Sequence, residues 1–241
     1  MTLIVALRGK DGIVAAADSR GTFGDPRGVT AQNDSQQKVH IVSGHVALLM
    51  SGPGELGAQL IADIVQIIQA QGTDGATNVM AIVRATARQR YAEWFPHLPV
   101  AVLPGVPQMA RPDLALIVAG YDADGAGAYK LPRLYQTVSA LDFPPMLHEY
   151  GFALAGVAQY ALYLLNRLYE PDRSLSDLAS LAVYVIKETA SQDGKVGGPV
   201  RVVTVTPAKG GVALSEEDVH KLHASNEERG AALRKSFYTS K

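Results

Sequence analysis

The sequence contains no cysteine among its 241 residues. Disulfide bonds, thiolate zinc sites, iron–sulfur clusters and a cysteine nucleophile are therefore excluded. Covalent catalysis by a side chain would have to use another group, and a hydroxyl is the natural candidate.

Net charge and long hydrophobic runs are also scarce. The 22 basic and 23 acidic residues give a formal charge of −1, which lacks the positive footprint of a nucleic-acid-binding protein. The longest apolar stretch, 152–165, is interrupted by Gln159 and is shorter than the roughly 20 residues that span a bilayer. The apolar run 3–7 has no basic segment before it, unlike a signal peptide. We expect a soluble, cytoplasmic protein with no nucleic-acid or membrane partner.

Apolar periodicity predicts strands and helices in alternating blocks. Hydrophobic residues make up 47% of the chain, enough for a packed core. Continuous apolar runs predict strands buried on both faces, and helical spacing predicts paired helices. The strands are predicted at 3–7, 13–17, 39–42, 46–50, 114–119, about 128–131, 200–205 and 211–214, and the helices at about 54–68, 76–95, 150–169 and 174–192. Glycine-bearing and proline-rich loops are predicted at 21–37 and 96–112.

This order of elements favours two stacked antiparallel sheets between two helix layers. Strands do not alternate singly with helices, so a doubly wound parallel sheet is disfavoured. We predict a single domain over residues 1–241, with a charged helix or tail at 215–241.

Two motifs suggest cofactors without the context that those cofactors need. The segment Gly52-Pro53-Gly54-Glu55-Leu56-Gly57 matches a dinucleotide-binding pattern, but a second helix follows instead of a second parallel strand. We interpret it as a tight strand-to-helix turn. His220 and His223 lie one helical turn apart, but no further ligand accompanies them. We predict neither a metal nor an organic cofactor.

Thr2 directly follows Met1 and can carry nucleophilic chemistry if Met1 is removed. A free α-amine, with an unperturbed pKa of roughly 7.7–8.0, would then lie beside the Thr2 hydroxyl as a base. Many proteins begin Met-Thr without consequence, so the surrounding residues decide how this pair is interpreted.

Residues 2–20 resemble the start of mature proteasome β subunits. The shared features are the initial threonine, the turn Lys10-Asp11-Gly12 and the segment Ala16-Ala17-Asp18-Ser19-Arg20. Lys38 before an apolar strand and a strand ending in Ser51-Gly52 continue the resemblance, which is greatest to the bacterial proteasome homologues. It implies an α+β fold, the four-layer αββα sandwich of the N-terminal-nucleophile (Ntn) hydrolases.

The resemblance also implies roles for individual residues. Thr2 would be the nucleophile, and Lys38 would lower the pKa of its hydroxyl. Asp18 and Arg20 would hold Lys38, and the Gly52 N–H would stabilise the oxyanion. The alternative is that Asp18 and Arg20 form an ordinary ion pair at a strand end and that Lys38 is a solvated strand lysine.

Further positions would bind substrate or complete the catalytic group. The backbone of Thr22 and Gly54 would pair with an extended peptide, and Met50 would line the pocket for the side chain before the cleaved bond. Asp193 matches an aspartate of the family, and the resemblance implies that it belongs to the catalytic group.

The chain departs from the family pattern in two ways. The segment between Thr22 and Lys38 is a few residues longer than in typical β subunits. Val157 and Val196 stand where the family has serines that orient the N-terminal amine.

We therefore expect a threonine-type endopeptidase subunit of a self-compartmentalising proteasome-like ring, which hydrolyses polypeptides through an acyl-threonine intermediate. Its partners would be polypeptide substrates and further copies of itself in stacked rings, with any unfolding ATPase left open. The alternative is a catalytically weak or inactive ring protein of the same fold that acts in assembly or binding.

Overall fold

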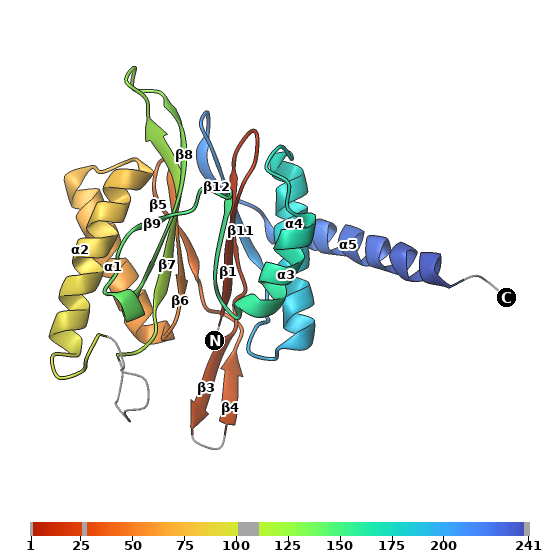
Figure 1. The fold of residues 1–241 in the computed structure, drawn as a ribbon, viewed down its shortest axis with the longest axis horizontal. Helices are drawn as coiled ribbons and strands as arrows, with labels where there is room; N and C mark the ends of the chain where they lie inside the picture. The colour runs from red at the N-terminus through yellow and green to blue at the C-terminus, as the bar shows by residue number, and fades with distance from the viewer. Residues whose placement is uncertain (1, 26–27, 101–110, 239–241) are drawn as a thin grey trace.

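Two antiparallel sheets lie face to face between two pairs of helices in the computed structural model, which describes residues 2–25, 28–100 and 111–238 (Figure 1). The strand order is β10-β1-β2-β11-β12 in the first sheet and β5-β6-β7-β8-β9 in the second. Helices α3 and α4 cover the first sheet, and α1 and α2 cover the second. The predicted four-layer αββα sandwich is therefore confirmed.

The strands are β1 (Leu3–Arg8), β2 (Ile13–Ala17), β3 (Gly21–Asp25), β4 (Gly28–Asn33), β5 (Val39–Ser43), β6 (Val46–Ser51), β7 (Ala115–Ala123), β8 (Tyr129–Val138), β9 (Met146–Leu147), β10 (Phe152–Gly156), β11 (Arg201–Thr206) and β12 (Gly210–Ala213). The helices are α1 (Gly54–Gln71), α2 (Ala76–Trp94), α3 (Ala158–Leu168), α4 (Leu175–Gln192) and α5 (Glu216–Phe237), with a short 3₁₀ turn at Ser139–Leu141.

Strand β1 shows why the apolar runs in this chain are continuous. Leu3, Val5 and Leu7 pack against the layer of α3 and α4, whereas Ile4 and Ala6 pack against the second sheet. Successive side chains of a strand point to opposite faces, so burial on both faces requires an unbroken apolar sequence. The prediction of strands buried on both faces is thus confirmed.

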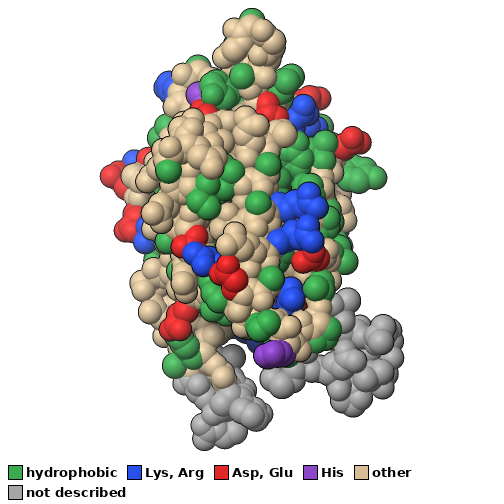
Figure 2. Space-filling model, turned by 90° about the vertical axis from the view of Figure 1, so that its left-hand side faces the viewer, with side chains coloured by type: hydrophobic (Ala, Val, Ile, Leu, Met, Phe, Trp, Pro, Cys, Tyr) green, Lys and Arg blue, Asp and Glu red, His purple; other side chains and the backbone are tan. Residues whose placement is uncertain are grey.

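The layer of α1 and α2 packs on the second sheet through an apolar face of α1. Its residues Leu60, Ile61, Ile64 and Ile68 are buried there. The outer surface of this layer carries basic and acidic side chains interspersed, with no large patch of one sign (Figure 2). Ion pairs such as Arg90 with Asp63 account for this mixture.

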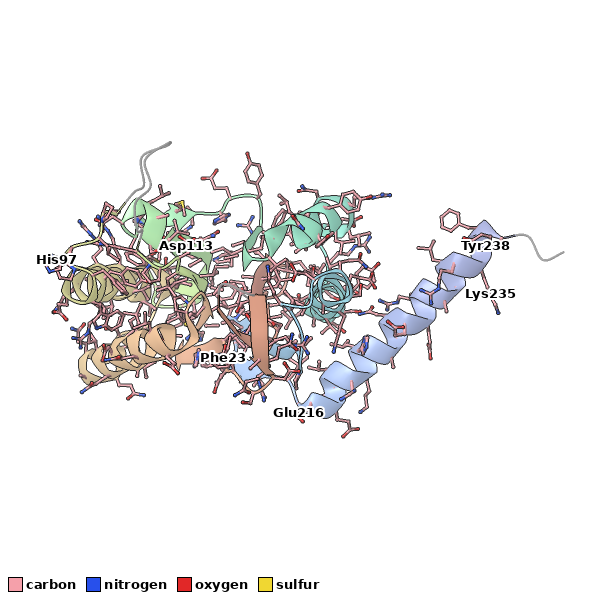
Figure 3. All side chains as sticks on the ribbon, turned by 90° about the horizontal axis from the view of Figure 1, so that it is seen from below. Phe23, His97, Asp113, Glu216, Lys235 and Tyr238 are labelled. Atoms are coloured by element: carbon pink, nitrogen blue, oxygen red, sulfur yellow. The ribbon has the colours of Figure 1, made fainter. Side chains whose placement is uncertain are left out.

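The first half of helix α5 packs against the body, where Val219 and Asn226 are buried and Asn226 bonds Ser180 of α4. Its second half projects away from the body toward Phe237 (Figures 1 and 3). The helix occupies the segment where the sequence predicts a charged helix. Ser215 caps it by accepting a hydrogen bond from the Asp218 N–H. Within the described part of the chain, no helix combines the length and the apolar character needed to cross a membrane.

The predicted loop at 21–37 is wrong, because most of it forms the two-stranded hairpin β3–β4. The hairpin extends beyond the body at the end where β1 begins (Figure 1). Its glycines and polar residues lack the apolar alternation that indicates a strand, since it joins neither large sheet. The proline-rich loop predicted at 96–112 lies in part, at 101–110, outside the described residues.

The predicted helix at 150–169 is also wrong in its first half. Residues 152–156 form β10, which pairs with β1, and α3 starts only at Ala158. A short apolar run can be a buried strand or a helix, and periodicity alone does not separate the two. Strand β8 is longer than predicted, and the sequence analysis missed β9 and the 3₁₀ turn.

Candidate active site

A cavity of about 380 Å³ opens beside Thr2, the residue that precedes β1. Two backbone segments form its walls: residues 20–23, which lead into β3, and residues 52–56, which start α1. Thr2 and Gln36 complete the lining. The cavity therefore surrounds the position at which the sequence predicts the nucleophile.

A buried ion pair lies directly behind this end of β1. The side chains of Lys38 and Asp18 are fully buried, and Lys38 Nζ lies 2.9 Å from Asp18 Oδ1. The same carboxylate oxygen accepts a hydrogen bond from the Leu3 N–H at 3.0 Å. Lys38 also donates to the Arg20 carbonyl at 2.6 Å. Asp18 thus anchors the lysine next to the residue that follows Thr2.

The second oxygen of Asp18 is equally well bonded. Asp18 Oδ2 accepts the Arg20 N–H at 3.1 Å and the Gly197 N–H at 3.0 Å. A buried charge is tolerated only when hydrogen bonds and an opposite charge replace its lost hydration. Asp18 has both, which excludes the alternative of an exposed strand-end pair with a solvated lysine.

Burial lowers the pKa of Lys38 below its ordinary value. The charge of Asp18 and its hydrogen bond oppose this shift, and the charge of Asp34 opposes it further. Arg20 acts in the same direction as burial. The net result is an ammonium group that loses its proton more easily than a surface lysine does.

Gly52 has a backbone conformation that its neighbours allow only to glycine. Its φ is +149°, and a Cβ there would lie 2.6 Å from the Asp113 carbonyl oxygen. Gly52 is part of the cavity wall that includes the first turn of α1, where backbone N–H groups lack helical partners. This wall can therefore stabilise negative charge in the cavity.

Comparison with known proteins agrees with this geometry. The family model of the proteasome subunit matches residues 2–102, the region that contains Thr2, Asp18, Lys38 and Gly52. The proteasome subunit beta of Methanopyrus kandleri is 26% identical over 92% of this chain and 94% of its own. The proteasome subunit beta 2 of Pyrococcus furiosus is 26% identical over 85% of this chain and 87% of its own. These matches show that the chain is similar to proteasome β subunits along most of its length.

Solved structures share the fold of this chain. Anbu (ancestral beta-subunit) from Yersinia bercovieri superimposes with a TM-score of 0.75 at 15% identity, covering 99% of this chain and 98% of the other. Anbu from Hyphomicrobium sp. strain MC1 gives a TM-score of 0.73 at 18% identity, covering 99% and 98%. At these identities the likeness establishes the fold.

The residues predicted to bind substrate divide into two groups. Thr22 and Gly54 lie on opposite walls of the cavity, as the pairing of an extended peptide requires. Met50 does not line this cavity. Its side chain is buried between the second sheet and α1, against Gly57. Met50 belongs to the alternating set of β6 side chains that face the helices, and its role in binding the side chain before the cleaved bond stays a prediction.

Asp193 lies at the end of α4, outside the cavity lining. Its carboxylate accepts the Lys195 N–H at 2.9 Å, and its carbonyl accepts the Val196 N–H at 3.0 Å. It shapes the turn that leads to Gly197, which donates to Asp18. Asp193 is thus connected to the buried pair through the backbone.

The two valines that replace family serines are buried in the apolar cluster between the first sheet and its helices. The Val157 N–H donates to the Thr2 carbonyl at 2.8 Å, so its backbone still fixes Thr2. Their side chains offer no hydrogen bond to an amine.

Sequence reasoning missed Gln36, Phe23 and Glu55 as lining residues of the cavity. Gln36 is wedged between the two walls, because a Cβ on Gly21 or on Gly54 would collide with its side-chain amide. It stands two residues before Lys38, but no local pattern marks it. The feature of the sequence that could have identified Gln36 is the pair Gly21 and Gly54. These glycines come from different segments and leave space for its side chain.

Proposed function

We propose that this chain is a threonine-type peptidase subunit in which Thr2 is the nucleophile. The observation that carries the proposal is the position of Thr2 on the lining of a cavity, one residue from the backbone group bound to the Asp18–Lys38 pair. The proposal requires processing that leaves Thr2 as the first residue. Met1, the residue to be removed, lies outside the described residues.

In the proposed reaction the Thr2 hydroxyl oxygen attacks the carbonyl carbon of a peptide bond. The Thr2 amine takes the hydroxyl proton, and the positive charge of Lys38 favours the alkoxide. The Gly52 N–H stabilises the oxyanion of the tetrahedral intermediate. The C–N bond then breaks, the leaving amine takes a proton, and an ester on Thr2 remains. Water hydrolyses this ester and frees the carboxylic acid.

Substrate binding follows from the two walls of the cavity. An extended peptide between residues 20–23 and 52–56 can add as a strand, with the backbone of Thr22 and Gly54 as partners. We propose further that the subunits form homo-oligomeric rings that enclose these cavities, as the similarity to proteasome β subunits suggests. We also propose that the rings lie in the cytoplasm and that polypeptides are the substrates.

A second candidate function is a weak or inactive ring protein of the same fold, acting in assembly or binding. The observation that favours it is the apolar burial of Val157 and Val196, because no side chain at these positions can orient the Thr2 amine.

Intact-mass measurement of the purified protein tests the first requirement, since retained Met1 would leave no free Thr2 amine. A threonine-directed electrophile should then add to Thr2 in the processed protein. Labelling should persist in Thr2→Ser, which keeps a hydroxyl, and vanish in Thr2→Ala. A processed protein that folds but is neither labelled nor able to cleave peptides would support the second candidate.

A further inference from the structure

An exposed carboxylate just after the β3–β4 hairpin is connected to the buried Asp18–Lys38 pair. Asp34, just beyond β4, receives both prongs of the Arg20 guanidinium: Nε at 2.7 Å from Oδ1 and Nη2 at 2.8 Å from Oδ2. The Asp34 side chain is 41% exposed, so this pair contributes little to stability. A bidentate contact of this kind nevertheless fixes the orientation of the guanidinium, because both of its hydrogen bonds must be aligned at once.

The oriented Arg20 guanidinium contacts the loop after α4. Its Nη1 donates to the Gly194 carbonyl at 3.2 Å. The guanidinium lies directly on Gly197, where a Cβ would come within 2.5 Å of its central carbon. The hairpin holds the same loop a second time, because Gln32 donates to the Gly194 carbonyl at 3.1 Å. Residues 194–197 are thus held on their outer side by Arg20, which precedes the hairpin, and by Gln32 of the hairpin.

The inner side of that loop bonds Asp18. The Gly197 N–H donates to Asp18 Oδ2, and the Gly197 carbonyl accepts the Ser19 N–H at 3.1 Å. The other donor to Asp18 Oδ2 is the Arg20 backbone N–H, from the same residue whose side chain Asp34 holds. Of the two donors to this oxygen, one is therefore the backbone of Arg20 and the other lies against the Arg20 guanidinium.

We propose that Asp34 is a positioning residue for the Asp18–Lys38 pair and hence for Thr2, acting through Arg20 and the 194–197 loop. The proposal rests on the proposed function for its catalytic consequence only. The contacts that lead from Asp34 through Arg20 and residues 194–197 to Asp18 can be tested without measuring turnover. Asp34 lies in the segment that is longer than in typical β subunits, so the residues that resemble the family do not predict it.

The test compares Asp34→Asn, which removes the charge at constant size, with Asp34→Glu, which keeps it. The matched control is Glu170→Gln, which breaks the exposed Arg173–Glu170 pair in the connection between α3 and α4. Hydrogen exchange of the peptide covering 193–200 reads the loop directly. We expect the Gly197 amide to exchange about tenfold faster in Asp34→Asn and unchanged in the other two variants.

Acylation of Thr2 by the electrophile supplies the second readout. In Asp34→Asn we expect a maximal rate about tenfold lower, with half-saturation within about twofold of the unmodified protein. The charged groups that act on Lys38 are Asp18, Asp34 and Arg20, and Asp34 raises its pKa. The alkaline limit of acylation should therefore move to lower pH in Asp34→Asn and stay in place in Asp34→Glu, which a merely structural role would not produce.

The outcomes separate this proposal from the proposed function. If the Gly197 amide exchanges at the same rate in Asp34→Asn as in Glu170→Gln, the positioning role is overturned, whatever the acylation rate. Faster loop exchange with an unchanged acylation rate and pH limit also overturns it, because the link would not reach Lys38. If the unmodified protein is never acylated at Thr2, the proposed function fails, and loop exchange alone decides whether Asp34 holds the loop.

Discussion

The α-carbon of Gly156 lies against the carbonyl group of Thr2, so closely that any side chain at position 156 would overlap it. Gly156 ends β10 in register with Leu3, with a φ of +96°. The next residue, Val157, donates its N–H to the same Thr2 carbonyl. The end of β10 thus fixes the backbone of the candidate nucleophile from one side, while Asp18 fixes Leu3 from the other.

Replacing Gly156 with alanine should therefore displace Thr2. The left-handed backbone and the overlap with Thr2 together should lower the free energy of unfolding by about 2 kcal/mol or more. Gly125→Ala is the matched control, since a Cβ there would meet nothing within 4 Å. Urea unfolding of both variants, with electrophile labelling of Thr2, checks the expectation. Equal stability of the two variants would contradict it.

Loss of the Lys38 ammonium should destabilise the fold as well as the site. Lys38→Met keeps the volume but leaves the buried Asp18 carboxylate without its counter-charge, which we expect to cost about 3 kcal/mol or more. Lys130→Met removes an exposed partner of Asp124 and should cost less than about 1 kcal/mol. Chemical denaturation gives both values. A small loss for Lys38→Met, similar to that for Lys130→Met, would mean that the hydrogen bonds of Asp18 suffice to hold its charge.

The double variant Asp18→Asn with Lys38→Met sharpens this prediction. It removes both charges, so its loss of stability should be smaller than the sum of the two single losses. A loss equal to that sum would show that the two charges do not interact in the folded protein.

The sequence predicts the layers of this fold because their signal is local. The run Leu3-Ile4-Val5-Ala6-Leu7 can be buried on both faces only as a strand between two layers, and that is how β1 lies. The same reasoning wrongly predicts a helix for the first half of 150–169, where the chain forms β10. The side chains of β10 are apolar enough for either element, and its pairing with β1 depends on residues about 150 positions away.

Some residues of the candidate site can likewise be predicted from the sequence, and others cannot. Asp18, Lys38 and Gly52 follow from a short family pattern, and the structure brings Asp18 and Lys38 together as predicted. Gln36 and Asp34 do not follow from it. Their roles arise from contacts with Gly54 and Arg20, which lie across a turn or a hairpin, and side-chain contacts across such distances leave no periodicity in the sequence.

Replacing Val157 and Val196 with serine should show how the two valines affect the stability of the fold and the acylation of Thr2. Val157→Ser and Val196→Ser each place a hydroxyl in the apolar cluster, so we expect each to lower the free energy of unfolding by about 1–3 kcal/mol. If serines orient the Thr2 amine, the double variant should acylate faster per folded molecule than the unmodified protein. Val157→Ala with Val196→Ala controls for lost volume. An equal acylation rate in the serine and alanine variants would mean that the amine needs no side chain from these positions.

Asp74, at the opposite end of the second sheet, should make the fold sensitive to acid. Burial raises the pKa of its carboxyl, but hydrogen bonds from Ser43, His45 and the Gly75 backbone together lower it from 3.8 to about 2. A pKa lowered by folding adds stability that is complete above the unfolded pKa near 4 and is lost as the pH falls through about 2. We expect this contribution to be about 1–2 kcal/mol for a partly exposed group.

Urea unfolding between pH 5 and pH 2 measures this contribution. Asp74→Asn should be less stable than the unmodified protein at pH 5, and the difference should shrink by that amount toward pH 2. Ser43→Ala keeps the carboxylate but removes the donor at 2.8 Å, so it should show the same trend with a smaller amplitude. A difference between Asp74→Asn and the unmodified protein that stays constant with pH would contradict the lowered pKa. In that case the hydrogen bonds around Asp74 would stabilise its protonated and ionised forms equally.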